Sequence, residues 1–136
     1  MFFCWSVLVK LYGLSGWLLV GIGTVHIALG VVMGWPSLVE IVQAGVWNSI
    51  QPNGELMFSR STILWFLLVG CFWWLLGGLM QAWLQTLSAP LPRWLGWGFV
   101  AAGLMVGILL PISGAWLFIP LGLLVVYGAP IVRQDT

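Results

Sequence analysis

The sequence is poor in charge and in cysteine, and each shortage excludes a class of protein. Charged residues make up 5% of the 136 positions, against roughly 25% in a soluble domain. The mean hydropathy is +1.11, which excludes a soluble catalytic module, and the net charge of +1 gives no sign of a nucleic-acid partner. The two cysteines, Cys4 and Cys71, are expected at different depths, so we expect no disulfide between them. This composition indicates an integral membrane protein.

Four apolar stretches are long enough to cross a bilayer. A hydrocarbon core about 30 Å thick needs about 20 apolar residues in a helix. The stretches are continuously apolar, without the alternation of a β-barrel strand, which favours helices. We therefore predict an all-α membrane protein, a four-transmembrane-helix bundle that forms one integral membrane domain over residues 1–136. The predicted spans cover residues 11–34, 61–83, 94–110 and 115–132.

The few charged residues predict how the bundle is oriented. With four spans, Lys10, Arg93 and Arg133 fall on one side of the membrane, and Arg60 is the cation on the other. Cytoplasmic loops carry an excess of Lys and Arg. Both termini are therefore predicted to face the cytoplasm, and the connection between the first two spans is predicted to face outward.

Residues 36–50 in that outer connection have an amphipathic pattern. Pro36 suits the first turn of a helix. The apolar positions then lie opposite the polar ones, with Leu38, Ile41, Val42 and Gly45 on one side and Glu40, Gln43 and Asn48 on the other. About a dozen residues are too few to cross the membrane. The pattern predicts a short helix that lies on the outer interface between the first and second spans.

Glycine is the main packing residue, with 18 of the 136 positions. In lipid, small residues let helix backbones approach closely and so support helix association. In the first span Gly16, Gly23 and Gly30 recur every seven residues, and His26 lies on the same face. The spacing therefore predicts that His26 faces another helix and not lipid.

A short segment of the first span recurs in the third. Residues 16–23 and 96–103 share four of their eight positions, at a constant offset of 80 residues. This offset pairs the first two spans with the last two as parallel repeats. It also matches His26 with Val106, so the pseudo-symmetry ends at the histidine.

His26 is the one ionisable side chain within the four predicted spans. Such a residue inside a membrane is by default a candidate for function. The favoured interpretation is structural, with the neutral imidazole donating a hydrogen bond to a neighbouring backbone carbonyl. Two alternatives stay open: a polar small-molecule, ion or proton site made with Glu40, Glu55 or Arg60, and axial ligation of a haem or chlorophyll-type ring.

Any ligand site is expected at the outer end of the bundle, where most polar groups are predicted to converge. Trp65 and Trp74, deep in the second span, are the candidate walls of a lipophilic pocket beside His26. No catalytic residue is predicted, and no metal site is predicted because HxxE, HxxxH and CxxC spacings are missing. The tetrapyrrole ligated by His26 is the one cofactor under consideration.

Short motifs along nearly the whole chain carry a family resemblance. The most distinctive is the Pro-x-Ser-Gly-x-Trp-Leu turn of residues 111–117. The others lie at residues 13–17, Gly23, His26, 40–48, 65–66, Gly70, Pro92, 95–98 and Pro120. With these motifs the chain resembles a family of small, uncharacterised bacterial four-helix membrane proteins, classed as a domain of unknown function. The resemblance implies a place in the bacterial cell membrane and supports four helices. It supplies no activity.

Two functional hypotheses follow. The leading one is a multi-pass membrane protein that is not an enzyme and acts through helix packing, as a homo-oligomer or as an accessory or structural subunit of a membrane complex. Its partners would be the lipid bilayer and itself or other membrane proteins. The alternative is a small membrane enzyme or a binder of a lipophilic ligand (quinone, pigment, haem or lipid) that uses His26 at the outer end of the bundle.

Overall fold

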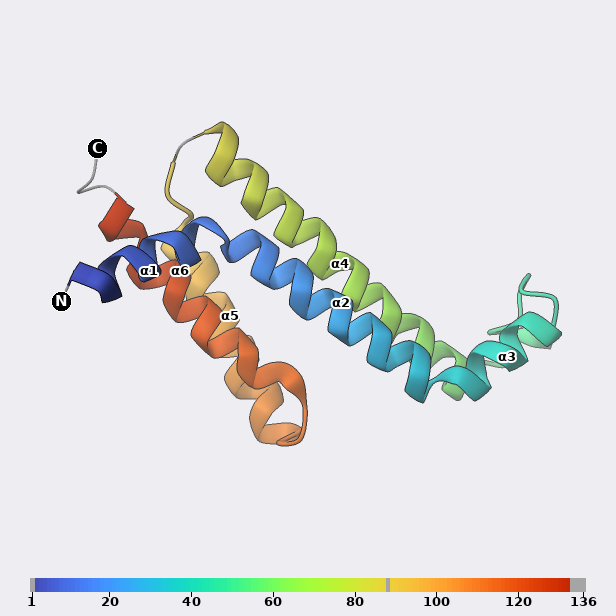
Figure 1. The fold of residues 1–136 in the computed structure, drawn as a ribbon. Helices are drawn as coiled ribbons and strands as arrows, with labels where there is room; N and C mark the ends of the chain where they lie inside the picture. The colour runs from blue at the N-terminus through green and yellow to red at the C-terminus, as the bar shows by residue number, and fades with distance from the viewer. Residues whose placement is uncertain (1, 88, 133–136) are drawn as a thin grey trace. The chain divides into compact units, whose positions relative to one another are not determined.

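The structure, a computed structural model, describes residues 2–87 and 89–132, with side chains from residue 7 to residue 128. Arg133 and the side chain of Cys4 therefore lie outside the described residues. The regular secondary structure of the described chain is all helical, with no strand, which confirms the all-α prediction. Its elements are α1 (Phe2–Gly13), α2 (Ser15–Met33), α3 (Trp35–Gln43), η1 (Pro52–Gly54), α4 (Phe58–Thr86), α5 (Arg93–Leu109), η2 (Gly114–Leu117) and α6 (Phe118–Val132) (Figure 1).

Two of the described helices are long and apolar enough to cross a membrane. They are α2, with 19 residues, and α4, with 29 residues. At 1.5 Å per residue these helices are about 28 Å and about 43 Å long, so each can cover a hydrocarbon core of about 30 Å. The apolar segments Arg93–Leu109 and Gly114–Gly128 are shorter. These two helices support a membrane location and do not establish four crossings.

The first predicted span is not one continuous helix. The helix is interrupted between Gly13 and Ser15. The Leu14 N–H bonds to the Leu11 carbonyl at 3.1 Å, and α2 then begins at Ser15. The carbonyl of Gly13, at the end of α1, accepts a hydrogen bond from Gln81 Nε2 at 2.9 Å. Carbonyls in the last turn of a helix have no intrahelical partner, and a side chain from α4 satisfies this one. No local sequence pattern predicts this cap.

The described chain divides into two compact units. Unit 1 joins Met1–Gly21 to Leu75–Thr136, and unit 2 is Ile22–Trp74. In unit 1, α5 and α6 pack as an antiparallel hairpin, and α1 packs against α6 (Figure 1). The buried hydrophobic residues of unit 1 are Tyr12, Leu19, Met80, Leu91, Phe99, Ala115, Phe118, Leu121, Val125 and Val126.

In unit 2, α2 and α4 pack through the glycines that the sequence predicted as a contact face. A Cβ built at Gly30 would lie 2.7 Å from the Phe66 ring, and one built at Gly34 would overlap Ile63. Gly70 of α4 likewise has no room for a Cβ, because Ile27 occupies that space. The predicted small-residue face of the first span is therefore confirmed within this unit.

Helix α3 is shorter than the amphipathic helix predicted over residues 36–50. It ends at Gln43, and the chain then turns through left-handed residues, with φ of +85° at Gly45, +65° at Val46 and +54° at Asn48. A β-branched residue rarely adopts this conformation. Two hydrogen bonds hold it here, from the Val46 N–H to the Ile41 carbonyl at 3.0 Å and from Ser49 Oγ to the Val46 carbonyl at 2.9 Å.

The glycine contacts recur through the chain at two constant offsets. In unit 1, a Cβ built at Gly16 would lie 2.5 Å from the carbonyl oxygen of Gly77, and one built at Gly77 would lie 2.6 Å from that of Gly16. The same reciprocal contact joins Gly96 and Gly122, at 2.6 Å and 2.5 Å. Gly96 follows Gly16 by 80 residues, and Gly122 follows Gly77 by 45 residues.

A second pair of contacts keeps both offsets. In unit 2, a Cβ built at Gly23 would lie 3.0 Å from the carbonyl oxygen of Gly70, and in unit 1, one built at Gly103 would lie 3.0 Å from that of Ala115. The offsets are again 80 and 45 residues. The predicted repeat is therefore present in the structure: α2 and α4 correspond to α5 and to the helical segment η2–α6. Helix α3 and the loop after it have no counterpart in the short connection between α5 and η2.

Candidate functional site

His26 lies on α2 in unit 2 and is held by the backbone of α4. Its Nε2 is 3.0 Å from the carbonyl oxygen of Phe66, and because a carbonyl oxygen only accepts, Nε2 carries the hydrogen. The imidazole stacks on the Phe66 ring, with centroids 3.8 Å apart and planes 14° apart. It is also tilted against Trp73 at 4.5 Å. This is the backbone hydrogen bond that the structural interpretation of His26 predicts.

Small residues on both helices make room for the imidazole. Gly70 follows Phe66 by one helical turn, and a Cβ there would lie 3.3 Å from His26 Cδ2. Gly23 precedes His26 by about one turn, and a Cβ there would lie 3.2 Å from Trp73 Cβ. The seven-residue glycine pattern therefore places His26 at the helix contact, as its spacing indicates.

The two tryptophans predicted to wall a pocket do not form the ring contacts of His26. Trp74 donates its indole N–H to Thr24 Oγ1 at 3.0 Å. Trp65 is 61% exposed. Phe66 and Trp73 hold the imidazole instead, and sequence reasoning missed both as partners. The signal that could have found Phe66 is its spacing of four residues from Gly70 on the predicted contact face.

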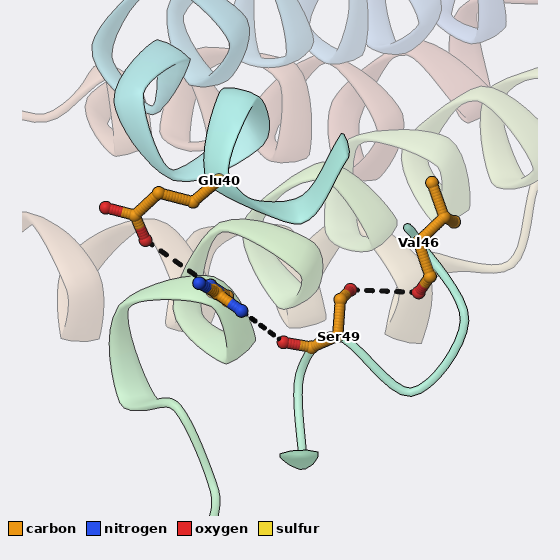
Figure 2. A network of polar contacts seen from close by, with 4 residues as sticks. Glu40, Val46 and Ser49 are labelled. Atoms are coloured by element: carbon orange, nitrogen blue, oxygen red, sulfur yellow. Dashed lines mark hydrogen bonds and ion pairs between the residues drawn. The ribbon is translucent and has the colours of Figure 1, made fainter. Parts of the chain in front are cut away.

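Arg60 forms a separate polar cluster at the start of α4. Its Nε pairs with Glu40 Oε2 at 3.3 Å, and its Nη1 donates to the Ser49 carbonyl at 2.7 Å (Figure 2). The Arg60 side chain is 15% exposed and that of Glu40 is 50% exposed, so the ion pair itself contributes about 1 kcal/mol or less. The contacts join α3, the loop after it and the start of α4.

The predicted polar site around His26 is therefore only partly assembled among the described residues. Glu40 and Arg60 meet each other, but neither makes a hydrogen bond or ion pair with His26. Glu55 is exposed, and no contact of its carboxylate with another described residue is observed. A clamp for an anionic ligand at Arg60 would first have to displace Glu40.

Two polar side chains of unit 1, Tyr12 and Gln81, are deeply buried, and neither was among the predicted site residues. The Tyr12 hydroxyl accepts a hydrogen bond from the Leu91 N–H at 2.7 Å, and the Tyr12 ring fills the space beside Gly128. Tyr12 is 1% exposed and Gln81 is 6% exposed. In the repeat, Gln81 corresponds to Val126, so the same helix contact also accepts an apolar side chain. The sequence feature that could have pointed to this burial is Gln81 itself, a single amide side chain within an apolar segment.

The donor set for metals is sparse. Within the described part of the chain, no three of His, Cys, Asp and Glu come together. Cys71 is a free, exposed thiol. Because the Nε2 hydrogen of His26 is engaged by Phe66, axial ligation through that nitrogen would require this hydrogen bond to break.

Comparison with known proteins finds one matching family. A family model described as a family of unknown function (DUF6463) matches residues 10–130. No curated protein matches, and no solved structure matches.

Proposed function

We propose that this chain, which belongs to the family of unknown function DUF6463, is a multi-pass membrane protein whose two repeated hairpins cross the bilayer four times. It acts through helix packing, as a homo-oligomer or as an accessory or structural subunit of a membrane complex. Its place is the bacterial inner membrane, with both termini in the cytoplasm.

The repeated glycine contact carries the proposal of four crossings. Helices α5 and α6 correspond by constant offsets to α2 and α4, which are the two candidate spans. With 17 residues, α5 is about 25 Å long, close to the thickness of a hydrocarbon core. Its outer face carries five large apolar side chains that are 44% to 73% exposed: Trp97, Leu104, Met105, Ile108 and Leu109. A continuous apolar face of this size favours lipid or protein as its surroundings.

Charge placement supports the orientation. Lys10 lies in α1 and Arg93 begins α5, so four crossings put both on the side of the termini. Arg60, at the start of α4, then lies on the other side, where it is paired with Glu40. An excess of Lys and Arg is typical of cytoplasmic loops.

Helix α3 supports an interfacial position for the outer connection. An apolar hollow on its surface is lined by Trp35, Leu38, Val39, Val42 and Gln43. Trp47, in the loop after the helix, is 92% exposed. A short helix with one apolar face and a neighbouring tryptophan fits the boundary between headgroups and acyl chains.

The proposed packing role is supported by the exposed apolar side chains of the described helices. Large apolar side chains are exposed on all the long helices, while the polar groups of His26 and Arg60 are bonded mainly within the protein. Surfaces of this kind bind other membrane helices by close packing and by a few interhelical hydrogen bonds.

Oligomeric state in lipid tests the proposal. The protein, labelled with a fluorophore on each chain and reconstituted at low density into vesicles, should bleach in two or more steps per spot. If it is an accessory subunit, a membrane protein should instead purify with it at constant stoichiometry in mild detergent. Single-step bleaching over the whole range of protein-to-lipid ratios, with nothing copurified, would contradict the packing role.

A further inference from the structure

One ring nitrogen of His26 has no partner in the described chain. Nε2 donates to the Phe66 carbonyl, and a neutral imidazole then has an acceptor lone pair on Nδ1. The neutral form is the less costly one in an apolar medium. The bonding directions of the two ring nitrogens diverge, so Nδ1 is directed away from that carbonyl. Among the described residues, none donates a hydrogen bond to Nδ1.

Packing of α2 on α4 does not require this imidazole. The corresponding helices of the second repeat make the same glycine contacts with Val106 in the place of His26. A polar group at a half-buried position in an apolar helix therefore needs a reason outside the hairpin itself.

A hydrogen-bond donor of the same chain lies at the same depth. Trp65 directly precedes Phe66, whose carbonyl holds His26, so both side chains lie at about one level along the hairpin. Trp65 is 61% exposed, and its indole N–H makes no hydrogen bond with any described residue. Val69 and Phe72, on the same side of α4, are 37% and 58% exposed. Together they form an apolar face with one unused donor, at about the depth of the unused acceptor.

We infer that this face of unit 2 is the contact between two copies of the chain, with Trp65 of each copy donating to Nδ1 of His26 of the other. Two copies inserted in the same orientation place equal residues at equal depth, and a twofold axis makes the contact reciprocal. Acyl chains offer no donor to Nδ1, whereas a second copy supplies one on a face that is otherwise apolar. The inference rests on the proposed homo-oligomer and names its interface.

The test measures dimer dissociation in lipid vesicles by energy transfer between labelled chains, over a series of protein-to-lipid ratios. Trp65→Phe keeps the ring and removes the donor, and His26→Val takes the residue found at the same place in the second repeat. Each should weaken the dimer about tenfold, and the double variant should be no weaker than either single variant. Trp97→Phe, which alters an exposed indole of α5, should leave dissociation unchanged.

Disulfide trapping gives a second readout that does not depend on the stability of the variants. In a chain without other cysteines, Val69→Cys should form an interchain disulfide under mild oxidation. The matched control is a chain with the natural Cys71 alone, which lies about 160° from position 69 around α4; this chain should form no interchain disulfide.

The outcomes separate this interface from the proposed function. Dimers that persist unchanged in Trp65→Phe, or that Cys71 traps as well as Val69→Cys, would overturn the interface and leave the oligomer standing. A monomeric wild-type chain would overturn the interface and the proposed homo-oligomer together. A lipophilic molecule that purifies with the chain and is lost in His26→Val, with dimerisation unaffected, would assign Nδ1 to a ligand and also overturn the interface.

Discussion

Tyr12 joins three segments of unit 1 at one side chain. Its ring, on α1, fills the space beside Gly128 of α6, and its hydroxyl accepts a hydrogen bond from the Leu91 N–H in the connection before α5. Leu91 is 3% exposed, so water does not replace the hydroxyl if it is removed. A buried N–H without a partner is costly because it loses its hydration and gains nothing.

Tyr12→Phe should therefore lower the free energy of unfolding by about 1–3 kcal/mol. The ring and its packing stay, and only the acceptor for Leu91 is lost. The matched control is Tyr127→Phe, which removes the hydroxyl from a side chain that is 62% exposed and should change stability little. Unfolding in mixed micelles with increasing denaturing detergent measures both. Equal losses in the two variants would show that the Leu91 contact contributes nothing specific.

The contrast between His26 and Tyr12 shows which residues could be predicted. The glycines every seven residues are local in the sequence, and they are enough to turn His26 toward another helix. The partner of Tyr12 lies 79 residues away, and the match depends on the relative register of α1, α6 and the connection, which no local pattern contains. Phe66 and Trp73 were missed for the same reason, because the register of α4 on α2 decides which aromatic ring meets the imidazole.

At the scale of elements, the glycine faces explain why α2 packs on α4 and α5 on α6. At each crossing the backbones approach so closely that a Cβ would lie 2.5–2.6 Å from a carbonyl oxygen on the opposite helix. The backbone of the opposite helix cannot move aside for an added methyl group as a flexible side chain can. Other glycines of the same helices, such as Gly21 and Gly98, have nothing within 4 Å.

Gly16→Ala and Gly96→Ala should each destabilise the protein by about 1–3 kcal/mol, because the added methyl group separates the paired helices. Gly21→Ala in α2 and Gly98→Ala in α5 are the controls. Their methyl groups meet open space, and alanine is the better helix former by up to about 1 kcal/mol. Detergent-induced unfolding compares the four variants. If Gly96→Ala were as harmless as Gly98→Ala, the equivalence of the two hairpins would be refuted.

The ends of the elements were predicted less well than their existence. The break between α1 and α2 depends on Gln81 reaching the carbonyl of Gly13, a contact between residues 68 positions apart. The early end of α3 depends on left-handed conformations at Val46 and Asn48, which their residue types do not require. Apolar length predicted the helices, and contacts between distant segments set where they stop.

For the whole molecule, the repeat gives the membrane topology its physical basis. If α2 and α4 cross the bilayer, the helices that repeat their contacts are expected to cross it too. The turn at residues 110–114 then faces outward, as does the loop at η1. Ile112 is fully exposed in this turn, and Asn53 is in η1. With only two crossings, Ile112 would remain on the cytoplasmic side.

Labelling of single cysteines with a membrane-impermeant maleimide in intact spheroplasts tests the four crossings most directly. In a chain whose Cys4 and Cys71 are replaced by serine, Asn53→Cys and Ile112→Cys should both react from outside. Ala89→Cys, in the connection between α4 and α5, should react only after the membrane is opened. Labelling of Asn53→Cys from outside while Ile112→Cys stays protected until lysis would contradict the second pair of crossings, and with it the proposed architecture.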